Sequence, residues 1–274
     1  MANDPTWNFL DPACKPRLLG TLRGEAEDVL KLASDPKRWD APTACAGWQV
    51  RDVVGHLVDA TEGYFPGFDI AYNGGSAPEP LGLRSMAKLA DDHAKSFRKA
   101  TQDEMLDRLH DDFARAMREF ESLTADDWLG LQVHHPFMGP IPSGFFPIFQ
   151  LVDYAVHGWD IRQGTGEPHA MAAESADLLA PLIFVLWQAT ADTSSVTTPF
   201  SVGVRLSGVN GGETRLDVSN EGVQFAPGDV SDCAAVLDFD PATFVLTGYG
   251  RMNGGTVSGD REAAAALRRL FFAI

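Results

Sequence analysis

The sequence predicts a helical bundle followed by a smaller α+β domain, an architecture of class α plus α+β. Apolar residues recur at helical spacing through most of the first 190 residues, whereas period-two alternation appears only beyond residue 200. A Ser- and Thr-rich stretch at 191–199 separates the region with helical spacing from the region with period-two alternation. We place the domains at residues 1–168 and 169–274.

The first domain is expected to contain four long helical segments, at residues 16–33, 49–65, 85–123 and from about 150 to the glycines at 164 and 166. Pro36 ends the first, because proline disfavours helix in the residue before it. Asp52 lies three residues after Gln49, from where its carboxylate can accept from the helix-start amides. Pro66 is expected to end the second segment.

Two stretches of the first domain are expected to lack regular structure. Residues 73–84 are rich in Gly and Pro, and Trp128 to Phe149 is rich in Pro, Gly and Phe. The third helical segment is expected to break near Thr101. Long crossovers between long helices are typical of a bundle, whose interior commonly holds side-chain metal sites.

The second domain is expected to mix three strands with three helices. The strands are predicted at 200–206, 214–218 and 234–239, and the helices at 172–190, 241–246 and 261–272. This pattern predicts an α+β module.

Composition excludes several functions. The formal charge of −16 argues against nucleic-acid binding and against docking on an anionic membrane. No secretory signal is visible, and the longest apolar stretch is too short to span a bilayer. Three widely spaced cysteines without a CxxC pair indicate reduced thiols, and hence a cytoplasmic location.

One pair of residues carries the strongest chemical signal. Asp153 and His157 are four residues apart, so a helix places them on one face, among apolar neighbours. A carboxylate and an imidazole in this arrangement can hold a divalent cation, and His56 is the best candidate for a third ligand. Three protein ligands leave coordination positions open, as in catalytic sites. The alternative is that His56 and His157 are hydrogen-bonded core histidines.

Three motifs resemble the mycothiol-dependent maleylpyruvate isomerase-like family. The first is Thr43 to Leu57, TACAGWQVRDVVGHL. The second is Val156 to Asp160, VHGWD, followed by the glycines near 165. The third is Gly250-Arg251 before Val257 to Asp260, VSGD. They occur in order and cover nearly the whole chain.

This resemblance implies a DinB-like four-helix bundle that holds a divalent metal, usually zinc, and a sterol-carrier-like C-terminal module. Carried over by position, the metal ligands are His56, Asp153 and His157. The acid is commonly glutamate in the isomerase, whereas this chain has the shorter Asp153. Arg251 falls at the family's tail arginine, which handles acidic groups of the substrate. The thiol cosubstrate would be mycothiol.

Other polar and aromatic residues near these motifs have two interpretations each. Asp59 and Asp160 either orient the ligand histidines or lie at the surface or a helix end. For the remaining candidates a structural role is favoured over a role in the site. Packing is favoured for Trp48 and Trp159, an inert buried thiol for Cys45, and exposure to solvent for His134-His135. The phenylalanines between 137 and 149 either line a pocket near the metal or pack in the core.

The leading functional hypothesis is a metalloenzyme that uses a low-molecular-weight thiol. It would isomerise, or transfer the thiol to, a small carboxylated substrate such as a maleylpyruvate-like enedioate. One alternative keeps the metal and uses bound water in a hydrolase or lyase. Another is a small-molecule binding or resistance protein without turnover. The expected partners are a small-molecule substrate and a thiol, and the chain is expected to be a monomer or dimer.

Overall fold

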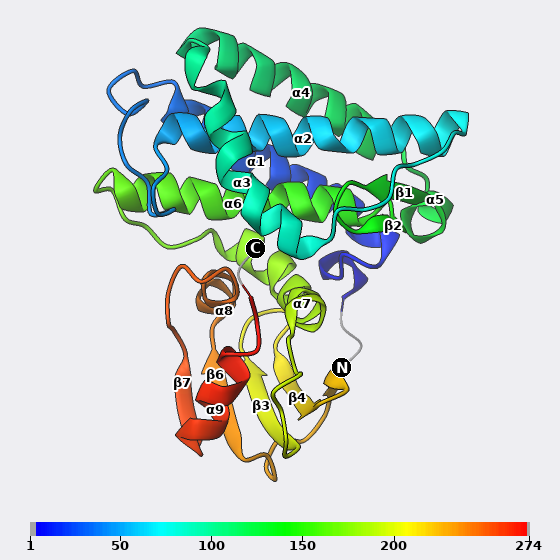
Figure 1. Cartoon of the computed structure of the whole chain (residues 1–274), viewed down its shortest axis with the longest axis vertical. Helices are drawn as coiled ribbons and strands as arrows, with labels where there is room; N and C mark the ends of the chain where they lie inside the picture. Colours follow the sequence, from blue (N-terminus) through cyan, green and yellow to red (C-terminus); the bar gives the residue numbers. More distant parts are fainter. Residues whose placement is uncertain (1–3, 273–274) are drawn as a thin grey trace. The chain divides into compact units, whose positions relative to one another are not determined.

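The computed structural model describes residues 4–272, which form two compact units divided between Met171 and Ala172. The first unit is helical with one small hairpin, and the second combines helices with a sheet (Figure 1). The chain therefore has the predicted fold class, an N-terminal helical bundle followed by an α+β module.

The helical unit is built from long helices with short pieces between them. Its elements are η1 (Pro5–Trp7), η2 (Pro12–Cys14), α1 (Lys15–Ala33), α2 (Val50–Asn73), α3 (Leu83–Ser96), η3 (Phe97–Lys99), α4 (Gln102–Ser122), α5 (Ala125–Gly130), β1 (Gln132–His135), β2 (Gly139–Pro142) and α6 (Phe145–Gly164).

Helices α1, α2, α4 and α6 pack side by side as the bundle, and α3 lies across α2 (Figure 1). Helix α1 buries one stripe that includes Leu18, Leu22 and Val29, as expected for a helix with one solvent face. Helix α6 is buried almost continuously from Phe146 to Ile161. The helix that carries the acid–histidine pair is therefore the central element of the bundle.

The prediction that α2 ends at Pro66 is wrong, because the helix continues through this residue to Asn73. Proline removes one backbone donor and crowds the preceding turn, but packing of the second half of α2 holds it helical, with Phe68 buried. At the other end the prediction for Asp52 is confirmed. Its Oδ2 accepts from the backbone N–H of Gln49 at 2.8 Å.

The stretch predicted to be irregular, 128–149, is more ordered than expected. It contains the second half of α5, the hairpin of β1 and β2, and the start of α6. Sequence periodicity does not reveal these strands, because each has only four residues. Two of the four residues in β2 are prolines. Strand β1 lies against α2, where Gly67 meets the carbonyl oxygen of His134.

In its described residues, the C-terminal unit has three helices and one five-stranded sheet. Its elements are α7 (Ala173–Thr190), β3 (Phe200–Leu206), β4 (Gly212–Ser219), β5 (Gly222–Pro227), β6 (Ala235–Phe239), α8 (Pro241–Gly248), β7 (Thr256–Gly259) and α9 (Arg261–Arg268).

The strand order is β5-β4-β3-β6-β7, with β3 and β6 parallel and the other neighbours antiparallel. The sequence did not predict β5 or β7, which are the edge strands of the sheet. Phe184 of α7 packs on Phe225 of β5 and on Phe244 of α8, so aromatic rings join these helices to the sheet. Among residues 4–272, no helix has the length and apolar character needed to cross a membrane.

The contact between α2 and the hairpin gives a test of the fold. A methyl group at Gly67 would overlap the carbonyl oxygen of His134, so Gly67→Ala must shift β1. We expect a loss of about 1–3 kcal/mol in the free energy of unfolding, measured by urea denaturation.

Gly24→Ala in α1 is the matched control, because open space surrounds that position. It should raise stability by about 0.5–1 kcal/mol, since alanine is the better helix former. Equal effects of the two substitutions on stability would contradict the close contact between Gly67 and β1.

Candidate metal centre

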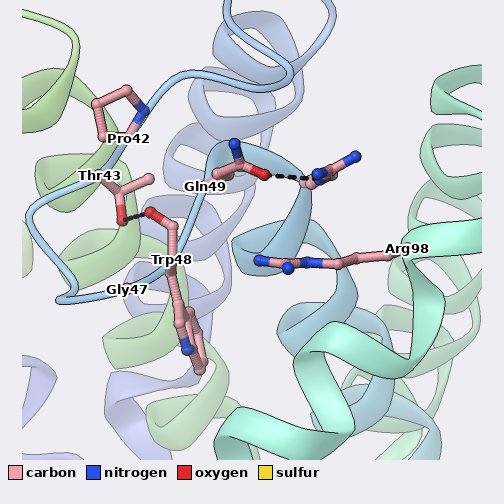
Figure 2. Close-up of a pocket in the computed structure, with 7 residues that line it drawn as sticks. Pro42, Thr43, Gly47, Trp48, Gln49 and Arg98 are labelled. Atoms are coloured by element: carbon pink, nitrogen blue, oxygen red, sulfur yellow. Dashed lines mark hydrogen bonds between the residues drawn. The ribbon is translucent and has the colours of Figure 1, made fainter.

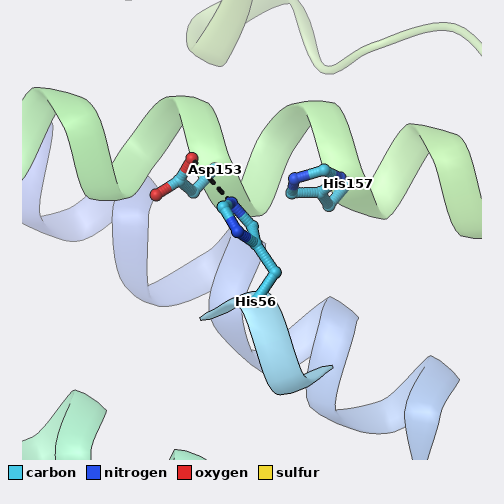
Figure 3. Close-up of side chains that lie close together, drawn as sticks. All are labelled: His56, Asp153 and His157. Carbon is cyan, nitrogen blue, oxygen red and sulfur yellow. Dashed lines mark ion pairs between the residues drawn. The ribbon is translucent and has the colours of Figure 1, made fainter. Parts of the chain in front are cut away.

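Two neighbouring helices bring the three sequence-predicted ligand residues together. His56 projects from α2, and Asp153 and His157 project from successive turns of α6 (Figure 3). His56 Nε2 lies 3.8 Å from Asp153 Oδ1, and the imidazole centroids of the two histidines are 5.0 Å apart. One ligand atom from each residue lies within 4.8 Å of the other two.

The arrangement fits a divalent cation. Ligands about 2.1 Å from a tetrahedral ion lie about 3.4 Å from one another, so small side-chain rotations would close this cluster around one cation. Two imidazoles and one carboxylate also form a donor set that zinc commonly takes. His56 and Asp153 remain about a fifth exposed, so a further ligand can reach the site from solvent.

Asp160 holds the imidazole of His157. Its Oδ2 lies 3.0 Å from His157 Nδ1, and both side chains are buried. A carboxylate at Nδ1 favours the tautomer with the proton there, which leaves the lone pair of Nε2 for a cation. Of the two acids considered for this role, Asp160 contacts a candidate ligand, whereas Asp59 contacts His93 of α3 at 3.1 Å.

Trp48 lies against both candidate histidines. Its ring stacks on His157 with centroids 5.7 Å apart and an interplanar angle of 25°, and it is tilted against His56 at 5.2 Å. The indole is 7% exposed. Trp48 was weighed as a packing residue, and the structure shows that what it packs on is the candidate metal centre.

A pocket of about 440 Å³ opens where the loop before α2 meets η3. Figure 2 shows Arg98 reaching from its helix towards α2, while the indole of Trp48 extends away from Pro42 and Thr43. Arg98 makes a bidentate pair with Asp52, whose side chain is fully buried. Burial opposes ionisation of Asp52, but hydrogen bonds from Arg98 and Gln49 outweigh it and lower its pKa.

His135 lies in an aromatic cluster on the hairpin side of the helical unit. Its ring contacts Tyr64, Phe146 and Phe149, with centroids 5.8–6.1 Å apart. The backbone N–H of Phe137 donates to its Nδ1 at 3.3 Å. Burial lowers the pKa of His135 to about 4, with the charge of Asp153 opposing the shift. His135 is therefore a neutral imidazole at physiological pH.

The other sequence candidates lie in different places. Arg251 belongs to the C-terminal unit, where it follows α8 and its Nη1 donates to the carbonyl of Tyr249 at 3.0 Å. Cys45 is half-buried in the loop before α2. His134 and His135 are in β1 and are not members of the ligand cluster found in the described part of the chain. No sequence pattern pointed to Asp91 or His93 of α3, which contact Trp48 and Asp59 respectively.

The fold and the cluster define a helical-bundle protein with a candidate metal centre on two neighbouring helices. Residues 21–162, just over half of the chain, match the family described as the mycothiol maleylpyruvate isomerase N-terminal domain. The chain belongs to this family.

Solved structures show the same fold over most of the chain. The crystal structure of the mycothiol-dependent maleylpyruvate isomerase is 16% identical, with a TM-score of 0.60 over 89% of this chain and 92% of that one. A histidine-to-alanine mutant of that isomerase gives a TM-score of 0.60 at 15% identity, with the same coverage. A comparison with curated protein sequences gives no match.

The buried imidazole of His135 predicts a pH dependence of stability. The unfolded chain binds a proton at this residue below a pKa of about 6.5, whereas the folded protein does so only below about 4. Stability is therefore lost as the pH falls from about 6.5 to about 4, by up to ~3 kcal/mol from this residue.

The measurement is urea denaturation of the metal-free protein across this pH range, compared with His135→Asn, whose side-chain oxygen can still accept from Phe137. In the variant, the free energy of unfolding should change less with pH, because most of the contribution of His135 is removed. Parallel pH profiles for the two proteins would show that His135 is not held neutral.

Proposed function

We propose that this protein is a metal-dependent, mycothiol-using isomerase or S-transferase that acts on a small carboxylated substrate. One observation carries the proposal: His56, Asp153 and His157 present ligand atoms within 4.8 Å of one another in a bundle of this family. The proposed ligands are these three residues, and the proposed ion is Zn²⁺ or a similar divalent cation.

The chemistry that a cation supplies here is a lower pKa for a coordinated thiol, so that the thiol ionises at neutral pH. The residues of the chain do the rest. Asp153 contributes the negative charge that partly balances the ion, and Asp160 keeps Nε2 of His157 available. The partial exposure of His56 and Asp153 leaves an approach for thiol and substrate.

The proposed reaction is addition of the thiolate to an activated double bond. The sulfur lone pair forms a C–S bond to a cis enedioate, such as a maleylpyruvate-like substrate, while the π electrons move to the conjugated carbonyl oxygen. The former C=C bond is then a single bond; rotation about it, followed by return of the electrons from the oxygen, re-forms the double bond, expels the thiolate and leaves the trans isomer. In an S-transferase the adduct takes up a proton and is released.

Arg251 is the proposed partner for a substrate carboxylate. Its guanidinium can make two parallel hydrogen bonds to a carboxylate, which fixes both position and orientation. The residue is half-buried in the C-terminal unit, and its Nη1 already donates to the Tyr249 carbonyl, which limits its rotamers.

The metal part of the proposal is tested by elemental analysis. Protein purified without metal-affinity resin and reconstituted with Zn²⁺ should hold about one equivalent, because three ligands bind one ion. His56→Ala and His157→Ala should each fall to ~0.1 equivalent or less and lose turnover, with unchanged far-ultraviolet circular dichroism. His110→Ala is the matched control, since His110 is exposed and pairs only with Asp111 among the described residues. A wild-type protein that takes up no divalent metal would refute the proposal.

The role of Arg251 is tested kinetically with mycothiol and a cis enedioate. Arg251→Ala should lower kcat/KM by about 10-fold or more, because a charge-assisted hydrogen bond is worth about 1.5–3 kcal/mol. Its zinc content should stay at the wild-type value. Arg261→Ala is the control in the same unit, where Arg261 is exposed and makes no side-chain hydrogen bond or ion pair within the described chain. Matching losses in the two variants would exclude a specific role for Arg251.

A further inference from the structure

The two candidate histidines are held in different ways. Asp160 fixes the ring of His157 through Nδ1. No residue between 4 and 272 makes a hydrogen bond to Nδ1 of His56, whose polar contact is the 3.8 Å approach of Nε2 to Asp153. Rotation of the His56 ring is therefore limited by packing, and the ring packed on it, besides His157, is Trp48.

Trp48 has a defined position of its own. Its Nε1–H donates to Asp91 Oδ1 of α3 at 3.0 Å, and Lys95 pairs with the same carboxylate at 2.5 Å. Hydrogen bonds from Lys95 and Trp48 lower the pKa of Asp91, so the acceptor is ionised at neutral pH. The Trp48 backbone is also held, with its N–H donating to Cys45 and its carbonyl accepting from Thr43.

Helix α3, which supplies Asp91, and η3, which follows it directly, are held on α2 around His56. Arg98 binds Asp52 one turn before His56, and His93 contacts Asp59 about one turn after it. Between them, Gly55 meets the carbonyl oxygen of Ala94, which is buried in this contact. Asp91 therefore presents its carboxylate to Trp48 from a fixed place.

We propose that Trp48 is a positioning residue, held by Asp91, that sets the orientation of the two imidazoles towards the cation. The inference rests on the proposed metal centre, and it assigns to α3 a part in metal affinity. Loss of the Trp48–Asp91 hydrogen bond frees the indole to turn, and the His56 ring then loses the surface that limits its rotation. A tryptophan that only fills space would affect stability and leave the ligand geometry unchanged.

The test is a double-mutant cycle read through cobalt. Co²⁺ replaces Zn²⁺ in sites of this kind and reports ligand geometry in its visible absorption. Trp48→Phe keeps an aromatic ring without the N–H, and Asp91→Ala removes the acceptor. We expect each to weaken Co²⁺ binding about 10-fold, measured by competition with a chromophoric chelator, and to change the visible spectrum.

Both substitutions remove the same hydrogen bond, between Trp48 and Asp91. The double variant should therefore bind Co²⁺ about 10-fold more weakly than the wild type, rather than about 100-fold. Asp91→Asn keeps an acceptor oxygen and should stay close to wild type. Asp92→Ala is the matched control on the same turn of α3, since Asp92 is exposed and makes no side-chain hydrogen bond or ion pair in residues 4–272.

Wild-type affinity and spectrum in Asp91→Ala would overturn the inference, as would single effects that multiply in the double variant. Asp91 is an exposed side chain, so this variant decides the question even where Trp48→Phe folds poorly. The proposed function fails differently, because the wild-type protein would then bind no Co²⁺ at all.

Discussion

The close approach of α2 to α6 is the constraint on which the rest of the helical unit depends. The imidazoles of His56 and His157 come within 5.0 Å of each other, and burial of the apolar residues beside them on both helices favours this arrangement. Val53 and Leu57 on α2, and Leu151 and Ala155 on α6, are all buried. The polar cluster is thus held in place by neighbours that have no chemistry of their own.

The features that sequence reasoning predicted are local ones. Spacing placed Asp153 and His157 on one helical face, and the motif around His56 identified the helix from which the third side chain projects. The position of Asp52 predicted its bond to the backbone of Gln49. Each conclusion needs only a helical repeat or the chemistry of a helix start, and both are written in a few consecutive residues.

The features that sequence reasoning missed depend on contacts between distant segments. The bond from Trp48 to Asp91 joins the loop before α2 to the helix that follows α2, and no periodicity encodes it. Asp59 and Asp160 look equivalent in the sequence, each three residues after a histidine. Asp59 contacts His93 of α3, whereas Asp160 is buried beside His157. Tertiary packing alone separates the two aspartates.

The passage of α2 through Pro66 has a mechanical consequence. The residue lacks a backbone N–H, so the hydrogen-bond ladder of α2 has a gap in the turn where Tyr64 and Gly67 lie against β1. Bending is cheapest where the ladder is interrupted. If β1 is displaced, we therefore expect α2 to bend in this turn, on the C-terminal side of the stretch that bears the imidazole.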